Sequence, residues 1–219
     1  MILHQDTAPS PAFTTGCRRC PRLARHLDDV KARYPGYHAR PVAAFGHSGA
    51  RLLVVGLAPG LHGANRTGRP FTGDHAGILL YATLHRFGFG SAPLSASAGD
   101  GLLLRGCRIT NAVRCLPPAN KPTPEEIRRC NRYLAAELAA LPPGSAVLAL
   151  GTIAHRAVLA ALDLRAAGRR FGHGARHPLP GEMTLFDSYH CSRYNTQTRR
   201  LTPQMFEAVF AAISEHLGA

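Results

Sequence analysis

The sequence has no apolar run that approaches the roughly 20 residues needed to cross a bilayer. Its first ten residues, MILHQDTAPS, also lack the basic and apolar regions of a secretory signal. These absences predict a cytoplasmic protein with no membrane partner. In that reducing compartment, the six cysteines are expected to be metal ligands, buried small hydrophobes or reactive groups rather than disulfides.

Negative charge is scarce as well. Thirteen carboxylates face 26 basic residues, and all of the latter except Lys31 and Lys121 are arginine. The resulting net charge of +13 indicates a polyanionic partner, because the planar guanidinium fork suits phosphate oxygens. A coding bias toward alanine, arginine, glycine and proline would give the same composition without any partner. The charge therefore indicates a class of partner and no activity.

The pattern of hydrophobic residues predicts an α/β fold. Short apolar runs that end in Gly, Asn, Asp or His alternate with stretches of helical periodicity. The runs lie at 52–56, 108–113, 146–151 and 183–190, and the helical stretches at about 20–33, 76–88, 123–140, 152–163 and 203–217. This alternation predicts a mostly parallel sheet with helices on both faces, in a single domain covering residues 1–219. Ligands of such sheets bind at the carboxyl ends of the strands.

Four cysteines form one candidate metal site. Cys17 and Cys20 make a Cys-x-x-Cys pair, and Cys115 and Cys130 lie far downstream. Four thiolates from two distant segments can tie an N-terminal arm, about residues 1–35, to the body of the domain. Zinc and iron–sulfur clusters both accept four cysteines, so the spacing does not choose between them. Ordinary buried cysteines remain the alternative.

The segment at 56–77, GLAPGLHGANRTGRPFTGDHAG, follows the first strong strand and contains six glycines. Glycines allow a backbone to approach a ligand closely, and Arg66 and Arg69 would add cations to the same crevice. The segment lacks both the Walker sequence and the spacing of the dinucleotide fingerprint. A nucleotide-like ligand therefore stays open, without a standard phosphate motif.

Most of the carboxylates belong to predicted helices, where a solvated or dipole-complementing charge is the ordinary role. Asp6 lies near the N-terminus, Asp100 in a small-residue loop and Glu182 in a turn, which leaves Asp74 and Asp187. Asp74 follows a glycine at the predicted crevice and can also cap the helix that starts near His75. Asp187 lies within a strand, and we expect it to form a structural ion pair.

Three further side chains are expected at the same edge of the sheet, with Asn111 and His190 at the ends of predicted strands and Phe71 in the glycine-rich segment. Asn111 can read the edge of a base through its amide, or bond its own backbone in a turn. Phe71 can serve as an aromatic platform or as core packing, and His190 can be structural or catalytic. The convergence of these three residues with Asp74 at one edge predicts a catalytic site.

Together these segments resemble the uracil-DNA glycosylase superfamily, and within it the family 5 (B-type) enzymes. The resemblance covers nearly the whole chain and rests on GLAPGLHGANRTGRPFTGDHAG, ITNAVRCLPPANKPTPEEIRRC, VLALG at 147–151 and YHCSRYNTQTRRLT. The four cysteines stand in the order that the family uses for a 4Fe-4S cluster. The resemblance implies a three-layer α/β/α fold around a central four-stranded parallel sheet, and iron rather than zinc.

The resemblance also implies roles in the site. Phe71 would stack on a flipped uracil, Asn111 would read its Watson–Crick edge, and His190 would stabilise charge that develops on the base. Gly56 and Leu57 would line the substrate site. Related family 4 enzymes carry Glu where this chain has Leu57, so the role of handling water must move elsewhere, and Asp74 is the nearest carboxylate.

The resulting hypothesis is a monomeric DNA repair glycosylase that excises uracil and other deaminated bases, such as hypoxanthine and xanthine. Arg66 and Arg69 would contact DNA, and Arg193 and Tyr194 would fill the gap that the flipped base leaves. Two alternatives stay open on the residues alone. One is a zinc-stapled nucleic-acid-binding module without catalysis, and the other is an enzyme that acts on free nucleotides or nucleosides.

Overall fold

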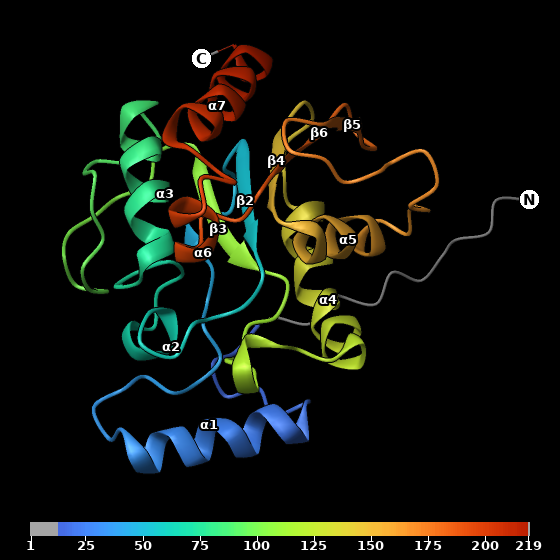
Figure 1. The fold of residues 1–219 in the computed structure, drawn as a ribbon. Coiled ribbons are helices and arrows are strands. Elements are labelled where there is room, and N and C mark those ends of the chain that lie inside the picture. Colours follow the sequence, from blue (N-terminus) through green and yellow to red (C-terminus); the bar gives the residue numbers. More distant parts are fainter. Residues whose placement is uncertain (1–12, 219) are drawn as a thin grey trace, which may run out of the picture.

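Four parallel strands form the centre of a six-stranded sheet with the order β1-β3-β2-β4-β6-β5 in the computed structural model, which describes residues 13–218 (Figure 1). The central strands are β2 (Leu52–Gly56), β3 (Cys107–Asn111), β4 (Ala146–Leu150) and β6 (Thr184–Ser188). At the edges, β1 (Phe45–Gly46) and β5 (Arg176–Pro178) pair antiparallel to their neighbours. The predicted parallel centre is confirmed, and the two short edge strands widen it.

Helices cover both faces of the sheet, because the central strands are apolar on both sides. Leu52 and Val54 pack on one face with α3 (His75–Arg86) and α7 (Pro203–Leu217). Leu53 and Val55 pack on the other face with α4 (Pro124–Ala139) and α5 (Thr152–Ala161). Alternate residues of one strand thus serve two cores, which gives the predicted three-layer arrangement.

The helices begin where the sequence predicts them. Thr123 caps α4 by accepting a hydrogen bond from the Glu126 N–H at 3.2 Å, and the Glu126 carboxylate accepts one from the Thr123 N–H at 2.7 Å. This reciprocal pair is a capping box, which fixes the start of the helix predicted at about 123–140. The remaining helices are α1 (Pro21–Arg33), α2 (Ala64–Thr67), α6 (Arg193–Gln197) and the short 3₁₀ helix η1 (Pro118–Asn120).

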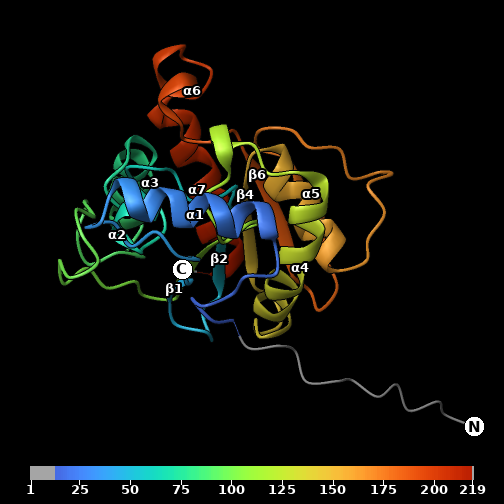
Figure 2. The same cartoon turned by 90° about the horizontal axis from the view of Figure 1, so that it is seen from below.

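The polar ends of the strands meet at one edge of the sheet. Gly56 is paired with Asn111 at the ends of β2 and β3, and Leu150 with Ser188 at the ends of β4 and β6. The segments that follow these residues therefore emerge together, and α1 lies across the molecule on this side (Figure 2). The first twelve residues of the predicted arm lie outside the described part of the chain. Within the described part, no helix is both long and apolar enough to cross a membrane.

Candidate active site

A cavity of about 360 Å³ opens at the carboxyl edge of the sheet. Its volume falls in the range of about 300–1,000 Å³ that is typical of small-molecule sites. Segments after three of the central strands contribute to its wall, which contains Leu57, Ala58, Gly60, Ala64, Phe71, Asp74, Ala76, Asn111, Asn120, His190 and Ser192. The structure thus brings together the four side chains from which the sequence predicts a catalytic site.

Gly56 allows two of these side chains to meet. A Cβ atom at this position would lie 2.4 Å from Asn111 Oδ1 and 2.5 Å from Phe71 Cζ, so only glycine fits without displacing them. Phe71 has a φ of +54°, which a non-glycine residue rarely adopts, and its side chain is buried. Its ring stacks on that of His190, with the centroids 5.9 Å apart and the planes 28° apart.

Asn111 presents an unsatisfied acceptor to the cavity. The residue is only 3% exposed, and its Oδ1 has no hydrogen-bond partner among the described residues. A buried polar oxygen without a partner costs free energy that a ligand N–H can recover. The backbone that carries it is fixed, because the Ala112 N–H donates to the carbonyl of Gly56 at 2.9 Å. The amide is therefore positioned to read a hydrogen-bond donor in the cavity.

Asp74 caps a helix and also borders the cavity. Its Oδ1 accepts a hydrogen bond from the Gly77 N–H at 2.9 Å and so caps α3, as the sequence predicts. Its Oδ2 lies against the glycine-rich segment, where a Cβ atom on Gly63 would come within 2.4 Å of it. Burial raises the pKa of Asp74 above the ordinary value, while the N–H groups of Gly77 and Ala76 oppose that shift. One carboxylate oxygen is thus engaged in the cap, and the carboxylate borders the cavity.

His190 is a neutral side chain at ordinary pH. Burial lowers its pKa to about 4, because the low-dielectric surroundings disfavour the imidazolium form. A neutral imidazole can still donate one hydrogen bond through its N–H. The loop is held by Asn195, whose Nδ2 donates to the His190 carbonyl at 2.8 Å, and by Ser192, which caps α6.

Of the four side chains predicted to contact DNA, three are exposed and one is buried. Arg66 and Arg193 are exposed, and Tyr194 at the start of α6 is 70% exposed, so these side chains are accessible to a large ligand. Arg69 requires a correction, because its side chain is buried. Its guanidinium donates to Asp100 Oδ1 at 2.6 Å and to Ser95 Oγ at 3.1 Å, which leaves it no role as a DNA contact.

Two residues of the cavity wall escape prediction from the sequence. Asn120 ends η1, where both it and Ala119 have positive φ angles of +55° and +52°. Ser192 lies in the short turn before α6. The segment 116–122 has no apolar periodicity, and its run of Pro, Ala and Asn signals only a turn. A turn signal does not indicate which cavity the turn borders.

The four cysteines of the predicted metal site line a second cavity, together with Phe13 and Tyr133. Cys17 lies before α1 and Cys20 is the residue at its N-cap. Cys115 follows β3, and Cys130 lies on α4. All are free thiols. Burial raises the pKa of Cys130 to about 11, and the other thiols of the group add to this, so a bound cation would have to offset the charge of the thiolates.

The surroundings of the thiols suit a group larger than one zinc ion. The Arg114 N–H donates to Cys130 Sγ at 3.4 Å, and the Tyr133 hydroxyl donates to Cys17 Sγ at 3.4 Å, as expected around ligating sulfurs. Zinc–sulfur bonds of about 2.3 Å in a tetrahedron place sulfurs about 3.8 Å apart. Among the described residues, only His155, His177 and Asp187 bring three potential ligand atoms within 4.8 Å of one another. The thiols are therefore more widely spaced than a single zinc site requires.

Comparison with known proteins identifies relatives that match most of the chain. Residues 43–214 match the profile of the uracil DNA glycosylase superfamily. The type-5 uracil-DNA glycosylase of Thermus thermophilus is 53% identical over 197 residues, which cover 88% of this chain and 90% of the relative. Those of Mycobacterium bovis and Pyrobaculum aerophilum are each 43% identical, over 91% and 92% of this chain and 77% and 89% of their own lengths.

Proposed function

The chain belongs to the uracil DNA glycosylase superfamily, and from this premise we propose that the cavity beside Asp74 holds a uracil flipped out of DNA. As a DNA glycosylase, the protein hydrolyses the N-glycosidic bond and leaves an abasic site in the strand. The observation that carries the proposal is the meeting of Asp74, Asn111, Phe71 and His190 in one cavity. A base within a stacked duplex cannot reach such a cavity, so flipping precedes the reaction at a cost of a few kcal/mol.

In the bound state, Phe71 would stack on the flipped base and Asn111 would pair with its edge. The unpartnered Oδ1 of Asn111 supports this role, because the N3–H of uracil is a donor of the right kind. A base that offers no donor at that place would leave the buried oxygen unpaired and would bind less well.

Breaking the bond leaves its electron pair on the base nitrogen, so the base becomes an anion and the sugar a cation. His190 would donate a hydrogen bond to the departing base from its neutral ring, which matches a pKa of about 4. The Asp74 carboxylate would stabilise the sugar cation and orient a water molecule for attack at C1′. The proton lost by that water would pass to Asp74 or to solvent.

We extend the proposal to other deaminated bases, such as hypoxanthine and xanthine. Leu57 lines the cavity with an apolar side chain and makes no polar contact that would select for uracil alone. Deaminated purines also carry an N–H on the edge that Asn111 would read. Arg66 would bind phosphates, and Arg193 and Tyr194 would occupy the gap in the stack, with the protein acting as a monomer.

For the cofactor, we propose a 4Fe-4S cluster held by Cys17, Cys20, Cys115 and Cys130. When bound, the cluster would supply a covalent connection between the N-terminal arm and the body of the domain. The hydrolysis requires no electron transfer. The wide spacing of the thiols and the two hydrogen bonds to sulfur support this assignment.

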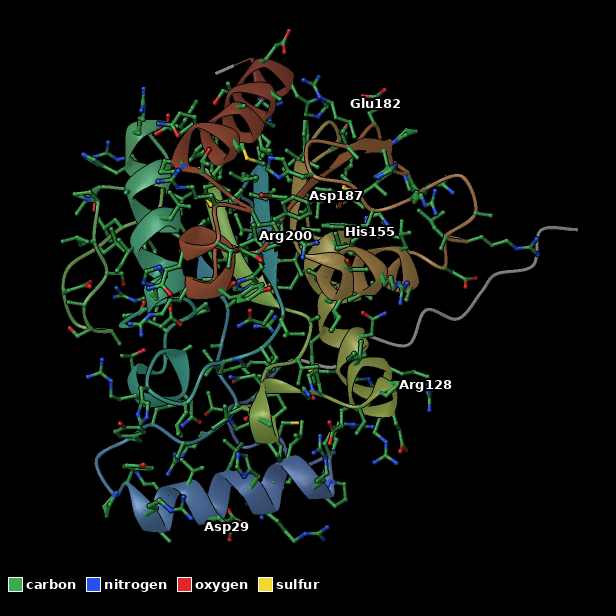
Figure 3. The ribbon with its side chains drawn as sticks, viewed as in Figure 1. Asp29, Arg128, His155, Glu182, Asp187 and Arg200 are labelled. Carbon is green, nitrogen blue, oxygen red and sulfur yellow. The ribbon has the colours of Figure 1, made fainter. Side chains whose placement is uncertain are left out.

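The proposal is tested by single-turnover release of uracil from a duplex with one uracil opposite guanine. Asp74→Asn keeps an acceptor for the Gly77 N–H but removes the charge, and we expect the rate to fall at least 100-fold. The matched control is Asp29→Asn, which removes an exposed carboxylate on α1 (Figure 3). No release by the wild type, with hypoxanthine also tested, would overturn the function. An unchanged rate in Asp74→Asn would overturn the role of Asp74 alone.

A further inference from the structure

The segment 164–176, which we call the arginine strap, connects α5 to β5 along one side of the molecule (Figures 1 and 2). It carries Arg165, Arg169, Arg170 and Arg176, and no acidic residue occurs from 164 to 181. The side chains of Arg165 and Arg170 are exposed and have no ion-pair partner among the described residues. The strap therefore presents unneutralised positive charge to solvent.

A buried aspartate holds the strap against the sheet. Asp187 on β6 is fully buried, and its two carboxylate oxygens each meet one histidine ring. His155 Nδ1 lies 2.8 Å from Oδ1, and His177 Nε2 lies 3.2 Å from Oδ2. His155 and Asp187 lie side by side where α5 meets β6 (Figure 3). The structure thus places the partners of the ion pair predicted for Asp187 within hydrogen-bond distance, and the cluster joins α5, β5 and β6.

The same residues also bind the backbone of the strap. His155 Nε2 lies 3.0 Å from the carbonyl of Arg169, and the Gly172 N–H donates to Asp187 Oδ2 at 3.3 Å. Both ring nitrogens of His155 therefore have an oxygen partner within hydrogen-bond distance, one on the sheet and one on the strap. The Gly174 N–H adds a bond of 2.8 Å to the Asp187 carbonyl. A segment with little apolar content is in this way fixed at several points.

The strap also contacts the loop of the active site. The His173 ring stacks on the Tyr189 ring, with the centroids 5.1 Å apart and the planes 19° apart, and His173 Nδ1 accepts a hydrogen bond from the Tyr189 N–H at 3.2 Å. Tyr189 directly precedes His190. The guanidinium of Arg200 lies 4.7 Å from the centre of the Tyr189 ring, which adds another exposed cation beside the strap.

We propose that the arginine strap is a second contact for the DNA backbone, outside the cavity, and that the His155–Asp187–His177 cluster positions it. The inference rests on the proposed function, because it requires that DNA lie over the His190 loop. Exposed arginines suit phosphates, and a segment that is already ordered loses little conformational entropy on binding. The contact reads no sequence, which fits an enzyme that must act wherever a damaged base occurs.

The test compares two double variants that remove the same charge. Arg165→Ala/Arg170→Ala removes the two exposed cations of the strap that have no ion-pair partner among the described residues. Arg128→Ala/Arg132→Ala removes two exposed arginines from α4, of which Arg128 is labelled in Figure 3. Binding to a duplex with a stable abasic-site analogue is measured over a range of salt concentrations. Each lost phosphate contact lowers the slope of log K against log[salt] by about 0.9. For the strap variant, we expect the magnitude of this slope to be about 2 smaller than for the wild type, and the affinity at low salt to be about tenfold weaker. The α4 variant should show neither change.

A slope equal to that of the α4 control would overturn the inference. Single-turnover release at saturating enzyme is measured alongside, and the strap variant should keep the wild-type rate because it leaves the cavity intact. Failure of the wild type to release any base would overturn the proposed function, while a reduced slope in the strap variant would still support the strap as a DNA contact. The two failures are therefore distinguishable.

The positioning role of Asp187 has its own test. Asp187→Asn should increase hydrogen exchange in residues 169–177 and reduce the salt slope as the strap variant does. Val158→Ala, which truncates a fully buried side chain of α5, serves as the destabilised control and should leave the slope unchanged. A salt slope in Asp187→Asn that equals the wild-type slope would contradict the positioning role.

Discussion

At the scale of single residues, Gly56 shows how closely the groups of the cavity approach one another. We expect Gly56→Ala to lower the rate of uracil release about 100-fold, because its Cβ would push Asn111 and Phe71 out of place and small displacements of substrate-positioning groups cost about this much. Gly99→Ala is the control, since no atom lies within 4 Å of its added Cβ. Single-turnover kinetics measure both variants, and a wild-type rate in Gly56→Ala would contradict the geometry.

The pH dependence of the reaction should reflect Asp74 and not His190. The carboxylate acts when ionised, so the rate falls as the pH drops through its pKa, which burial raises above the ordinary value of about 3.9. His190, with a pKa of about 4, is already neutral above about pH 5 and adds no change near pH 6–7. Single-turnover rates between about pH 5 and 9, where His190 stays neutral, test this, and any decline toward acid seen in the wild type should be absent from Asp74→Asn. A rate that falls as the pH rises through 6–7 would indicate a catalytic imidazolium instead.

Residues of the site could be predicted from the sequence where they follow a recognisable strand. Asn111 and His190 lie at the ends of apolar runs, and Asp74 is left with Asp187 once the other carboxylates are assigned to helices, turns, a loop and the N-terminal segment. Arg69 shows the limit of this reasoning, because its partner Asp100 lies 31 residues away and no local pattern connects them. The sequence pattern, a cation within a glycine-rich segment, is the same whether the cation binds a ligand or pairs with a carboxylate of the protein. The pattern alone therefore does not distinguish the two.

At the scale of elements, Glu126 joins two helices. Its carboxylate accepts hydrogen bonds from Arg22 Nε at 2.8 Å and Nη2 at 2.7 Å, in addition to the bond that caps α4. Glu126→Ala should destabilise the fold by about 2 kcal/mol, with about 1 from the cap and about 1 from the ion pair, which solvent screens because Arg22 is partly exposed. Thermal melting measures the loss. Glu125→Ala, which removes only the exposed i,i+4 pair with Arg129, should cost less than about 0.5 kcal/mol.

The effect of Glu126→Ala should also depend on pH. Burial raises the pKa of Glu126, but the Arg22 guanidinium and the Thr123 N–H outweigh it and hold the pKa below the ordinary value. A carboxyl with a depressed pKa contributes its stability above the unfolded pKa of about 4.3 and loses it as the pH falls through the folded value. The difference from wild type should therefore shrink in acid. A difference that stays constant down to about pH 2 would contradict the ion pair.

Long elements could be predicted from the sequence and short ones could not. The periodicity of α4 and α7, with Thr and Pro at their starts, gives their bounds to within a residue or two. The edge strands β1 and β5 have two and three residues, too few for any alternation of polar and apolar positions. They exist because the exposed edges of β3 and β6 offer backbone partners, which is a property of the folded sheet.

At the scale of the whole molecule, the four cysteines should control how the segment containing α1 attaches to the domain. We expect Cys17→Ala/Cys20→Ala to remove the visible absorption and the iron of the purified protein, because two ligands are lost. Its melting temperature should fall by about 10 °C, which corresponds to about 3 kcal/mol in a chain of this size and is typical of losing a covalent connection. Cys107→Ala, which truncates a buried cysteine of β3 outside the site, is the control. Colourless wild-type protein that contains only zinc would contradict the cluster.

In the proposed mechanism, the cavity at the carboxyl edge of the sheet receives the flipped base. The most direct measurement is a crystal structure of Asp74→Asn bound to a duplex with one uracil opposite guanine. We expect uracil inside the cavity, stacked on Phe71 and hydrogen-bonded to the amide of Asn111, with the arginine strap beside the phosphate backbone. The proposed binding mode would be contradicted if the duplex is bound to the protein but its uracil stays stacked between the neighbouring bases. Uracil flipped out to a place outside this cavity would contradict it as well.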